Sequence, residues 1–123
     1  MENYNEKIAM LLKKMGISPA LLGYKYLAEA IKIVLDNEDT AIEGITKCLY
    51  PAVAKKFKTT ISRVERGIRF AIEIAFSKMP VDMASAAFGN TISYEKGKAT
   101  NSEFIATIVE LITSEPNNPI WNM

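Results

Sequence analysis

The chain has 123 residues, of which 49% are apolar and 24% charged, and its formal net charge is +1 with no histidine. This length predicts one domain, and the apolar share is large enough to fill a core. No run of about 18 uncharged apolar residues occurs and the chain begins with polar and acidic residues, so we expect neither a spanning helix nor a secretory signal. The single cysteine, Cys48, fits a reducing cytoplasm, and its apolar neighbours favour a buried structural thiol over a reactive one.

Helical periodicity runs through almost the whole chain and predicts an all-α fold. An apolar stripe from Ile8 to Met15 predicts a first helix, which Gly16 ends as a C-terminal cap. Ser18 and Pro19 are typical of a helix start, and the next stripe continues to about Asp36.

The middle of the chain contains three further helical segments. Thr40 and Glu43 form a capping-box pair for a segment that reaches Leu49, and Pro51 kinks or restarts the helix, which continues to about Phe57. A longer helix is expected from about Thr60 to Lys78, and a short one follows from Pro80 to Gly89.

The C-terminal part begins with residues 90–99, which look irregular. Thr100 and Glu103 form another capping box, and the last apolar stripe follows it. Residues 115–123 contain two prolines and three asparagines, which predicts an unstructured tail. We therefore expect a helical domain over residues 1–114 and a flexible tail over 115–123.

The segment from Pro51 to Lys78 has the spacing of a helix-turn-helix, two helices joined at a steep angle by three or four residues. Close crossing requires a small residue on the first helix, here Ala54, and an aliphatic residue ten positions later, here Val64. Phe57 would fill the corner. The buried stripe of the second helix is expected to be Val64, Ile68, Ala71, Ile72 and Ala75.

All the arginines of the chain lie on that second helix, at Arg63, Arg66 and Arg69. We call these three residues the arginine arc, because helical spacing spreads them over about 120° of one exposed side, with Arg66 opposite the buried stripe. Residues 55–69 hold six cations and one acid and so carry +5, which leaves −4 for the rest of the chain. This local stripe indicates a polyanion held in one orientation, or else an ordinary solvated helix face.

The residue types on this helix suit the reading of a DNA duplex. An arginine such as Arg66 pairs with guanine, and a carboxylate such as Glu65 accepts a hydrogen bond from cytosine. The alternative for Glu65 is an ion pair with Arg69 four residues later. Four residues at the turn and helix start are of the types that commonly hold phosphates: Lys56, Lys58, Thr59 and Thr60.

The residues at these positions resemble the DNA-binding effector domains of the stage zero sporulation protein A family of bacterial sporulation regulators. The similarity covers about residues 8–112. It includes Gly23-Tyr24, Tyr26-Leu27, Ile45-Thr46-Lys47, Tyr50-Pro51, Ala54-Lys-Lys-Phe57, Thr59-Thr60, Ser62-Arg-Val-Glu-Arg66, Ile68-Arg69, Ala71-Ile-Glu73 and Thr100-Asn-Ser-Glu-Phe-Ile-Ala106.

The resemblance implies a six-helix transcription factor of the cytoplasm that binds TGTCGAA-like boxes, as a homodimer on tandem copies. It implies that Glu65 and Arg66 read bases, that Ser62 and Arg63 contact bases nearby, and that Arg69 contacts a base or a phosphate. It also implies a contact with the RNA polymerase sigma factor by residues 78–92. The candidates there are Lys78, Met79, Val81, Asp82, Ser85 and Phe88, although ordinary packing explains the apolar ones equally well.

Several positions depart from the family pattern. Phe70 stands where a histidine is expected, and Gly67 stands where an alanine is expected, which would cost about 1 kcal/mol of helix propensity. Met79-Pro80 replaces a more polar pair, and the tail with Trp121 replaces a basic end. The family's N-terminal receiver domain has no counterpart in this chain. We expect either an excised effector domain or a free-standing relative.

Two functions remain open: a sequence-specific DNA-binding regulator, and an interaction module that binds or competes with a full-length regulator or sigma factor. Catalysis is not expected. Without histidine there is no histidine-based triad and no cysteine–histidine metal site, and no phosphate-binding glycine loop occurs. We expect no cofactor and no metal.

Overall fold

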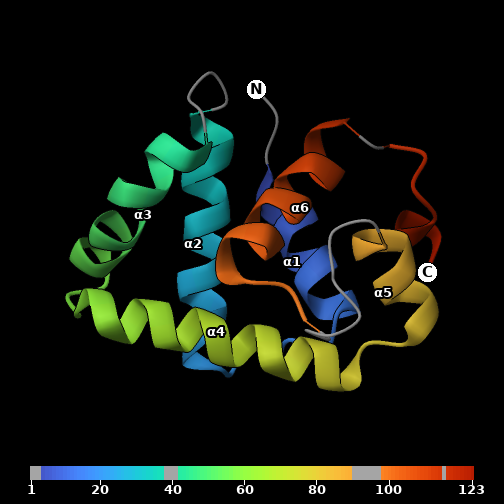
Figure 1. Cartoon of the computed structure of the whole chain (residues 1–123), viewed down its shortest axis with the longest axis horizontal. Helices are drawn as coiled ribbons and strands as arrows, with labels where there is room; N and C mark the ends of the chain where they lie inside the picture. The colour runs from blue at the N-terminus through green and yellow to red at the C-terminus, as the bar shows by residue number, and fades with distance from the viewer. Residues whose placement is uncertain (1–3, 38–41, 90–97, 115) are drawn as a thin grey trace.

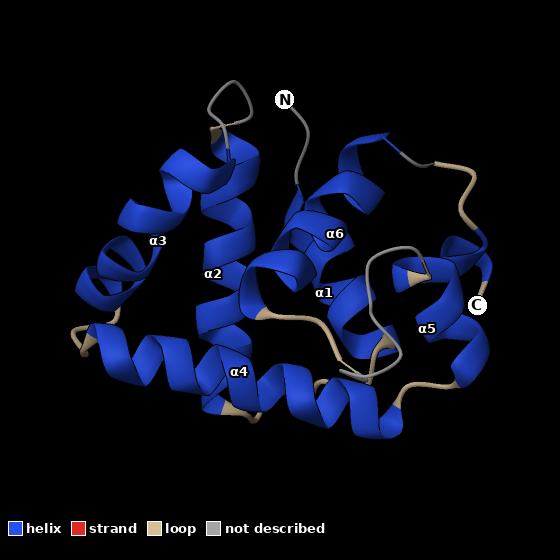
Figure 2. Ribbon diagram, viewed as in Figure 1, coloured by secondary structure: helices blue, strands red, loops and turns tan. Residues whose placement is uncertain are grey.

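The computed structural model describes residues 4–37, 42–89, 98–114 and 116–123, with only the backbone described at 42–47 and 114. The described residues form six α-helices and one short 3₁₀ helix, with no strand among them (Figure 2). The predicted all-α class is confirmed. The helices are α1 (Tyr4–Lys14), α2 (Leu22–Asp36), α3 (Ile42–Lys56), α4 (Ile61–Lys78), α5 (Val81–Phe88) and α6 (Asn101–Ser114), followed by η1 (Pro119–Asn122).

The core lies where α2 meets α1, α3, α4 and α6. In Figure 1, α4 runs along one side of the molecule, α3 stands at one of its ends and α5 at the other. The apolar stripes predicted for α1, α4 and α6 are all buried, which confirms the helical periods from which they were deduced. No described helix is long and apolar enough to cross a membrane.

The backbones of α2 and α4 approach each other closely at two glycines. A Cβ atom built on Gly23 would lie 2.0 Å from the backbone oxygen of Gly67, and a Cβ atom on Gly67 would lie 3.0 Å from the ring of Tyr26. The loss of helix propensity at Gly67 therefore has a structural reason, because the missing side chain leaves room for α2.

The start of α2 differs from the expected one. Ser18 accepts a hydrogen bond from the Ala20 amide at 3.1 Å and its carbonyl accepts another from Leu21, so it forms a turn, and α2 begins only at Leu22. Of the two outcomes expected at Pro51, a kink or a restart, the restart does not occur, because α3 runs through that residue. The predicted Thr40 capping box lies outside the described residues.

The expectation of an unstructured tail is wrong for its last residues. Pro119–Asn122 forms a 3₁₀ helix that lies against α5, with the Ile120 side chain fully buried. Asn118 caps this turn by accepting from the Ile120 amide at 2.9 Å, and its side-chain amide donates to the Ala86 carbonyl at 3.1 Å. Burial of one aliphatic side chain outweighed the local proline and asparagine signal.

Cys48 is exposed and not buried as predicted. The buried face of α3 passes through Leu49 and Val53. Cys48 is turned about 100° from Leu49 and about 140° from Val53, so it points toward solvent. The apolar neighbours in sequence lie on the other side of the helix.

Gly23→Ala is expected to destabilise the fold by about 3 kcal/mol, because the new methyl group meets backbone that has no free rotation to avoid it. The matched control is Gly67→Ala, whose methyl group would lie 3.0 Å from the Tyr26 ring and 3.4 Å from the Gly23 Cα, looser contacts than the 2.0 Å at Gly23, so its loss of stability should be smaller. Urea unfolding of the two variants measures the difference. Equal stability of the two variants would contradict a backbone-limited crossing.

Candidate nucleic-acid interface

The end of α3 and the start of α4 form a turn with defined backbone hydrogen bonds. The Thr59 amide donates to the Ala54 carbonyl at 2.9 Å and the Lys58 amide donates to Lys55, which is the Schellman pattern. Lys58 sits at the left-handed position of this motif with a φ of 53°. The turn therefore directs the chain from α3 into α4, as the helix-turn-helix spacing predicts.

The first turn of α4 is closed by Thr60. Its hydroxyl oxygen accepts a hydrogen bond from the Arg63 amide at 3.1 Å, so it is the N-cap of the helix. Thr60 was predicted to contact a phosphate, and the same hydroxyl is here committed to capping. Thr59, its neighbour, is half-buried.

The two faces of α4 are those that the sequence predicts. The buried side chains are Val64, Ile68, Ala71, Ile72 and Ala75. Ala54 of α3, the small residue expected at the crossing with Val64, is also buried. All three members of the arginine arc are exposed. Arg63 and Arg66 form no ion pair with another described residue, so their guanidinium groups are available to an anion.

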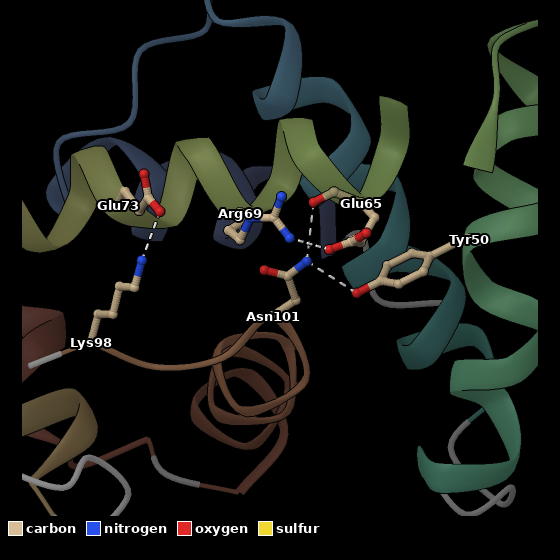
Figure 3. Close-up of polar contacts among 6 residues, drawn as sticks. All are labelled: Tyr50, Glu65, Arg69, Glu73, Lys98 and Asn101. Atoms are coloured by element: carbon tan, nitrogen blue, oxygen red, sulfur yellow. Dashed lines mark hydrogen bonds and ion pairs between the residues drawn. The ribbon is translucent and has the colours of Figure 1, made fainter. Parts of the chain in front are cut away.

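Glu65 and Arg69 form an ion pair along one edge of α4, the alternative considered from the sequence (Figure 3). Both side chains are about half exposed, so the pair is worth only about 0.5 kcal/mol. Such a weak pair opens readily when a competing partner is present.

Asn101, the first residue of α6, ties three helices together beside this pair. Its side-chain amide donates to the backbone carbonyl of Glu65 and to the hydroxyl of Tyr50, each at 3.2 Å (Figure 3). The start of α6 is fixed in turn by the predicted capping box, in which Thr100 and Glu103 exchange backbone–side-chain hydrogen bonds of 2.8 and 3.1 Å. The N-terminal half of α4 is thus held against α3 and α6.

A second ion pair lies farther along the same edge of α4. The Lys98 ammonium donates to Glu73 at 2.7 Å, and this hydrogen bond together with the Lys98 charge lowers the pKa of the Glu73 carboxyl (Figure 3). Because the pKa is lowered, the carboxylate stays ionised at neutral pH and the pair is lost only as the pH falls through that lowered value.

A groove of about 550 Å³ separates α4 from the segment that leads into α6. Tyr50, Ile61 and Ile72 contribute apolar surface, and Ser62 and Arg69 stand on the α4 side. No cluster of three or more potential metal-ligating side chains occurs in the described part of the chain.

Lys56 differs from the other predicted phosphate-binding residues because it already has a partner. Its ammonium lies 2.6 Å from the Glu29 carboxylate and 5.6 Å from the centre of the Phe57 ring. Lys58 is exposed and forms no ion pair with a described residue. The free cations beside the turn are therefore fewer than the charge count suggests.

The residues predicted to contact a sigma factor divide into two groups. Phe88 is fully buried and stacks on Phe104 at 5.3 Å between ring centroids, and Met79 is also buried, so both serve packing. The exposed candidates are Lys78, Val81, Asp82 and Ser85, with Val81 83% exposed. Residues 90–92 of this predicted segment lie outside the described part.

Sequence reasoning missed three side chains that shape this surface: Tyr50, Lys98 and Asn101. Tyr50 and Asn101 were noted only as part of a sequence match, and the hydrogen bond that joins them spans 51 positions. The capping box did locate the start of α6, but no local signal places that start against α4.

One comparison with known proteins bears on this surface. Residues 8–112 match the family model described as sporulation initiation factor Spo0A C terminal. The match includes the whole helix-turn-helix, the arginine arc and the start of α6.

Thr60→Ala is expected to lower the free energy of unfolding by about 1 kcal/mol, because the Arg63 amide loses its capping oxygen. Thr60→Ser retains that oxygen and is the matched control. Urea unfolding followed by circular dichroism measures both. A loss as large for serine as for alanine would show that the methyl group, and not the cap, matters.

Proposed function

We propose that this chain, which belongs to the sporulation initiation factor Spo0A C-terminal family, reads a DNA box resembling TGTCGAA by placing α4 in the major groove. Membership makes the chain a DNA-binding domain of the kind found in sporulation regulators. The box and the residues that read it are the proposal. The observation that carries it is the exposure of Arg66 opposite the buried stripe of α4.

Roles within the surface follow from position and chemistry. Arg66 offers its guanidinium fork to the O6 and N7 atoms of a guanine. Ser62 and Arg63 lie one turn earlier, where the first residues of a recognition helix meet base edges. Lys58, Arg69, the Thr59 hydroxyl and the first-turn amides of α4 hold phosphates. Lys56 joins them once its ion pair with Glu29 opens.

The Glu65 carboxylate has one partner in the free protein and a different one in the proposed complex with DNA. In the free protein its carboxylate pairs with Arg69. On the cognate box we propose that it turns to accept a hydrogen bond from the N4 amine of a cytosine, the base contact that carboxylates make in the major groove. The exposed pair with Arg69 costs little to open.

The proposal includes two protein contacts. Tandem boxes place two copies of the domain side by side on one duplex, as a homodimer. Four exposed residues, Lys78 at the end of α4 and Val81, Asp82 and Ser85 on α5, form the surface for a sigma factor. Val81, which is 83% exposed, would be covered in such a contact.

Arg66→Ala is expected to weaken binding to the cognate box by about 1–3 kcal/mol and to relax the preference at one base pair. Fluorescence anisotropy with a cognate duplex and with single-base variants measures both effects. For the unaltered chain, log K is expected to fall with log salt at a slope of about −4, as for four or five neutralised phosphates.

The control for this variant is Lys58→Gly, which removes a phosphate-facing cation at a backbone position that glycine adopts without strain. It should weaken all duplexes alike and leave the base preference unchanged. Equal affinity of the unaltered chain for cognate and scrambled duplexes would refute the proposal. If a complex with sigma factor or a full-length regulator forms while no duplex is bound, the domain is an interaction module instead.

Glu65→Ala separates the two roles of that carboxylate by the sign of the change. Base reading predicts weaker binding to the cognate box and slightly stronger binding to a scrambled duplex, because a negative charge near phosphate is removed. Pairing with Arg69 alone predicts stronger binding to both. Glu73→Ala, which removes a carboxylate from the same side of α4, is the control and should strengthen both.

A further inference from the structure

Phe70 is an aromatic side chain that the fold leaves uncovered. It is 56% exposed in the middle of α4. Its ring takes part in none of the ring–ring or cation–ring contacts found among the described residues, whereas Phe57, Phe76, Phe88 and Phe104 all do. Single exposed apolar residues are common, so exposure alone decides nothing. The position of Phe70 on the helix is what gives it meaning.

Phe70 lies within the arginine arc. At about 100° per residue it is turned about 40° from Arg66, toward Arg63. It is one turn beyond Arg66, or about 6 Å along the helix axis, which is roughly two base-pair steps of 3.4 Å. A duplex that brings a guanine edge to Arg66 therefore brings another base edge to the Phe70 ring.

The major groove offers one apolar group that a phenyl ring can cover, the C5-methyl of thymine. Apart from the small C5–H group of cytosine, the other positions on the base edges there are hydrogen-bond donors or acceptors, which gain nothing from a hydrocarbon ring. An α-helix with its side chains fits the major groove, about 12 Å wide, and not the minor groove, about 6 Å wide. This excludes a wedge inserted from the minor-groove side, and paired bases in a duplex leave no free face for stacking.

We infer that the Phe70 ring packs against the methyl group of a thymine about two base pairs from the guanine that Arg66 contacts. The inference rests on the proposed function and adds a specificity-determining residue to it. At this turn of α4 the base would be recognised by an apolar contact and not by a hydrogen bond. A base change that removes only one methyl group should therefore weaken binding.

The experiment uses duplexes in which each thymine of the box is replaced in turn by deoxyuridine, which keeps the pairing and removes the methyl group. Replacement of the contacted thymine, or of either of two adjacent thymines that share the contact, should weaken binding about fourfold. This is the loss expected for one buried methyl group worth about 0.8 kcal/mol. Phe70→Ala should bind the thymine duplex at least fourfold less tightly. The deoxyuridine replacement should then have no further effect on that variant.

Two further variants serve as controls. Phe70→Leu keeps an apolar contact and should retain most of the discrimination between thymine and deoxyuridine. Met10→Ala shortens an exposed apolar side chain on α1, away from the arginine arc, and should change no affinity. Because Phe70 and Met10 are both exposed, thermal unfolding should be nearly unchanged in all three variants.

The outcomes distinguish the two levels of the proposal. Specific binding to the box with no sensitivity to deoxyuridine, or with equal sensitivity in Phe70→Ala, overturns the thymine contact and leaves the proposed function intact. An equal loss by Phe70→Ala on scrambled and single-stranded DNA also overturns it, in favour of nonspecific stacking. Absence of specific box binding by the unaltered chain overturns both.

Discussion

The direct approach of α2 and α4 at Gly23 and Gly67 is the constraint on which the rest of the structure depends. With no side chain at either position, the backbone of α2 reaches the backbone oxygen of Gly67, and the neighbouring Tyr26 ring covers the crossing. The rotation of α4 about its own axis is then fixed on one side by backbone and on the other by the Asn101 amide. The arginine arc consequently faces solvent in one defined direction.

Charge is arranged on α4 so that one edge is neutralised and the centre is not. The pairs Glu65–Arg69 and Glu73–Lys98 both lie on the edge that faces the start of α6. Arg63 and Arg66 have no such partner among the described residues. These two guanidinium groups are therefore expected to contribute most of the binding free energy with a polyanion. The exposed ion pairs hold the side chains of the edge in place and contribute little free energy themselves. This division suits a helix whose centre reads bases and whose flanks contact phosphates.

Much of this surface follows from the sequence because it depends on local periods. The buried stripe of α4, its start near Thr60 and the capping box of α6 each use signals within a few residues, and all are confirmed. Ser18 was misinterpreted because a turn and a helix cap use the same side-chain hydrogen bond. The burial of Cys48 was mispredicted because it depends on which side of α3 the residue faces. The burial of Ile120 was missed because it depends on packing against α5, which is distant in sequence. The contact of Asn101 with Tyr50 required the tertiary structure.

The most direct test of the central claim observes the arginine side chains themselves. Because Arg63, Arg66 and Arg69 are the only arginines of the chain, a ¹H–¹⁵N spectrum of arginine side-chain Nε–Hε groups reports on the arginine arc alone. Addition of a TGTCGAA-type duplex should shift and sharpen the Arg66 signal, which a scrambled duplex should not do, while Arg69 responds to both. Three signals that stay unchanged at saturating cognate duplex would contradict the account.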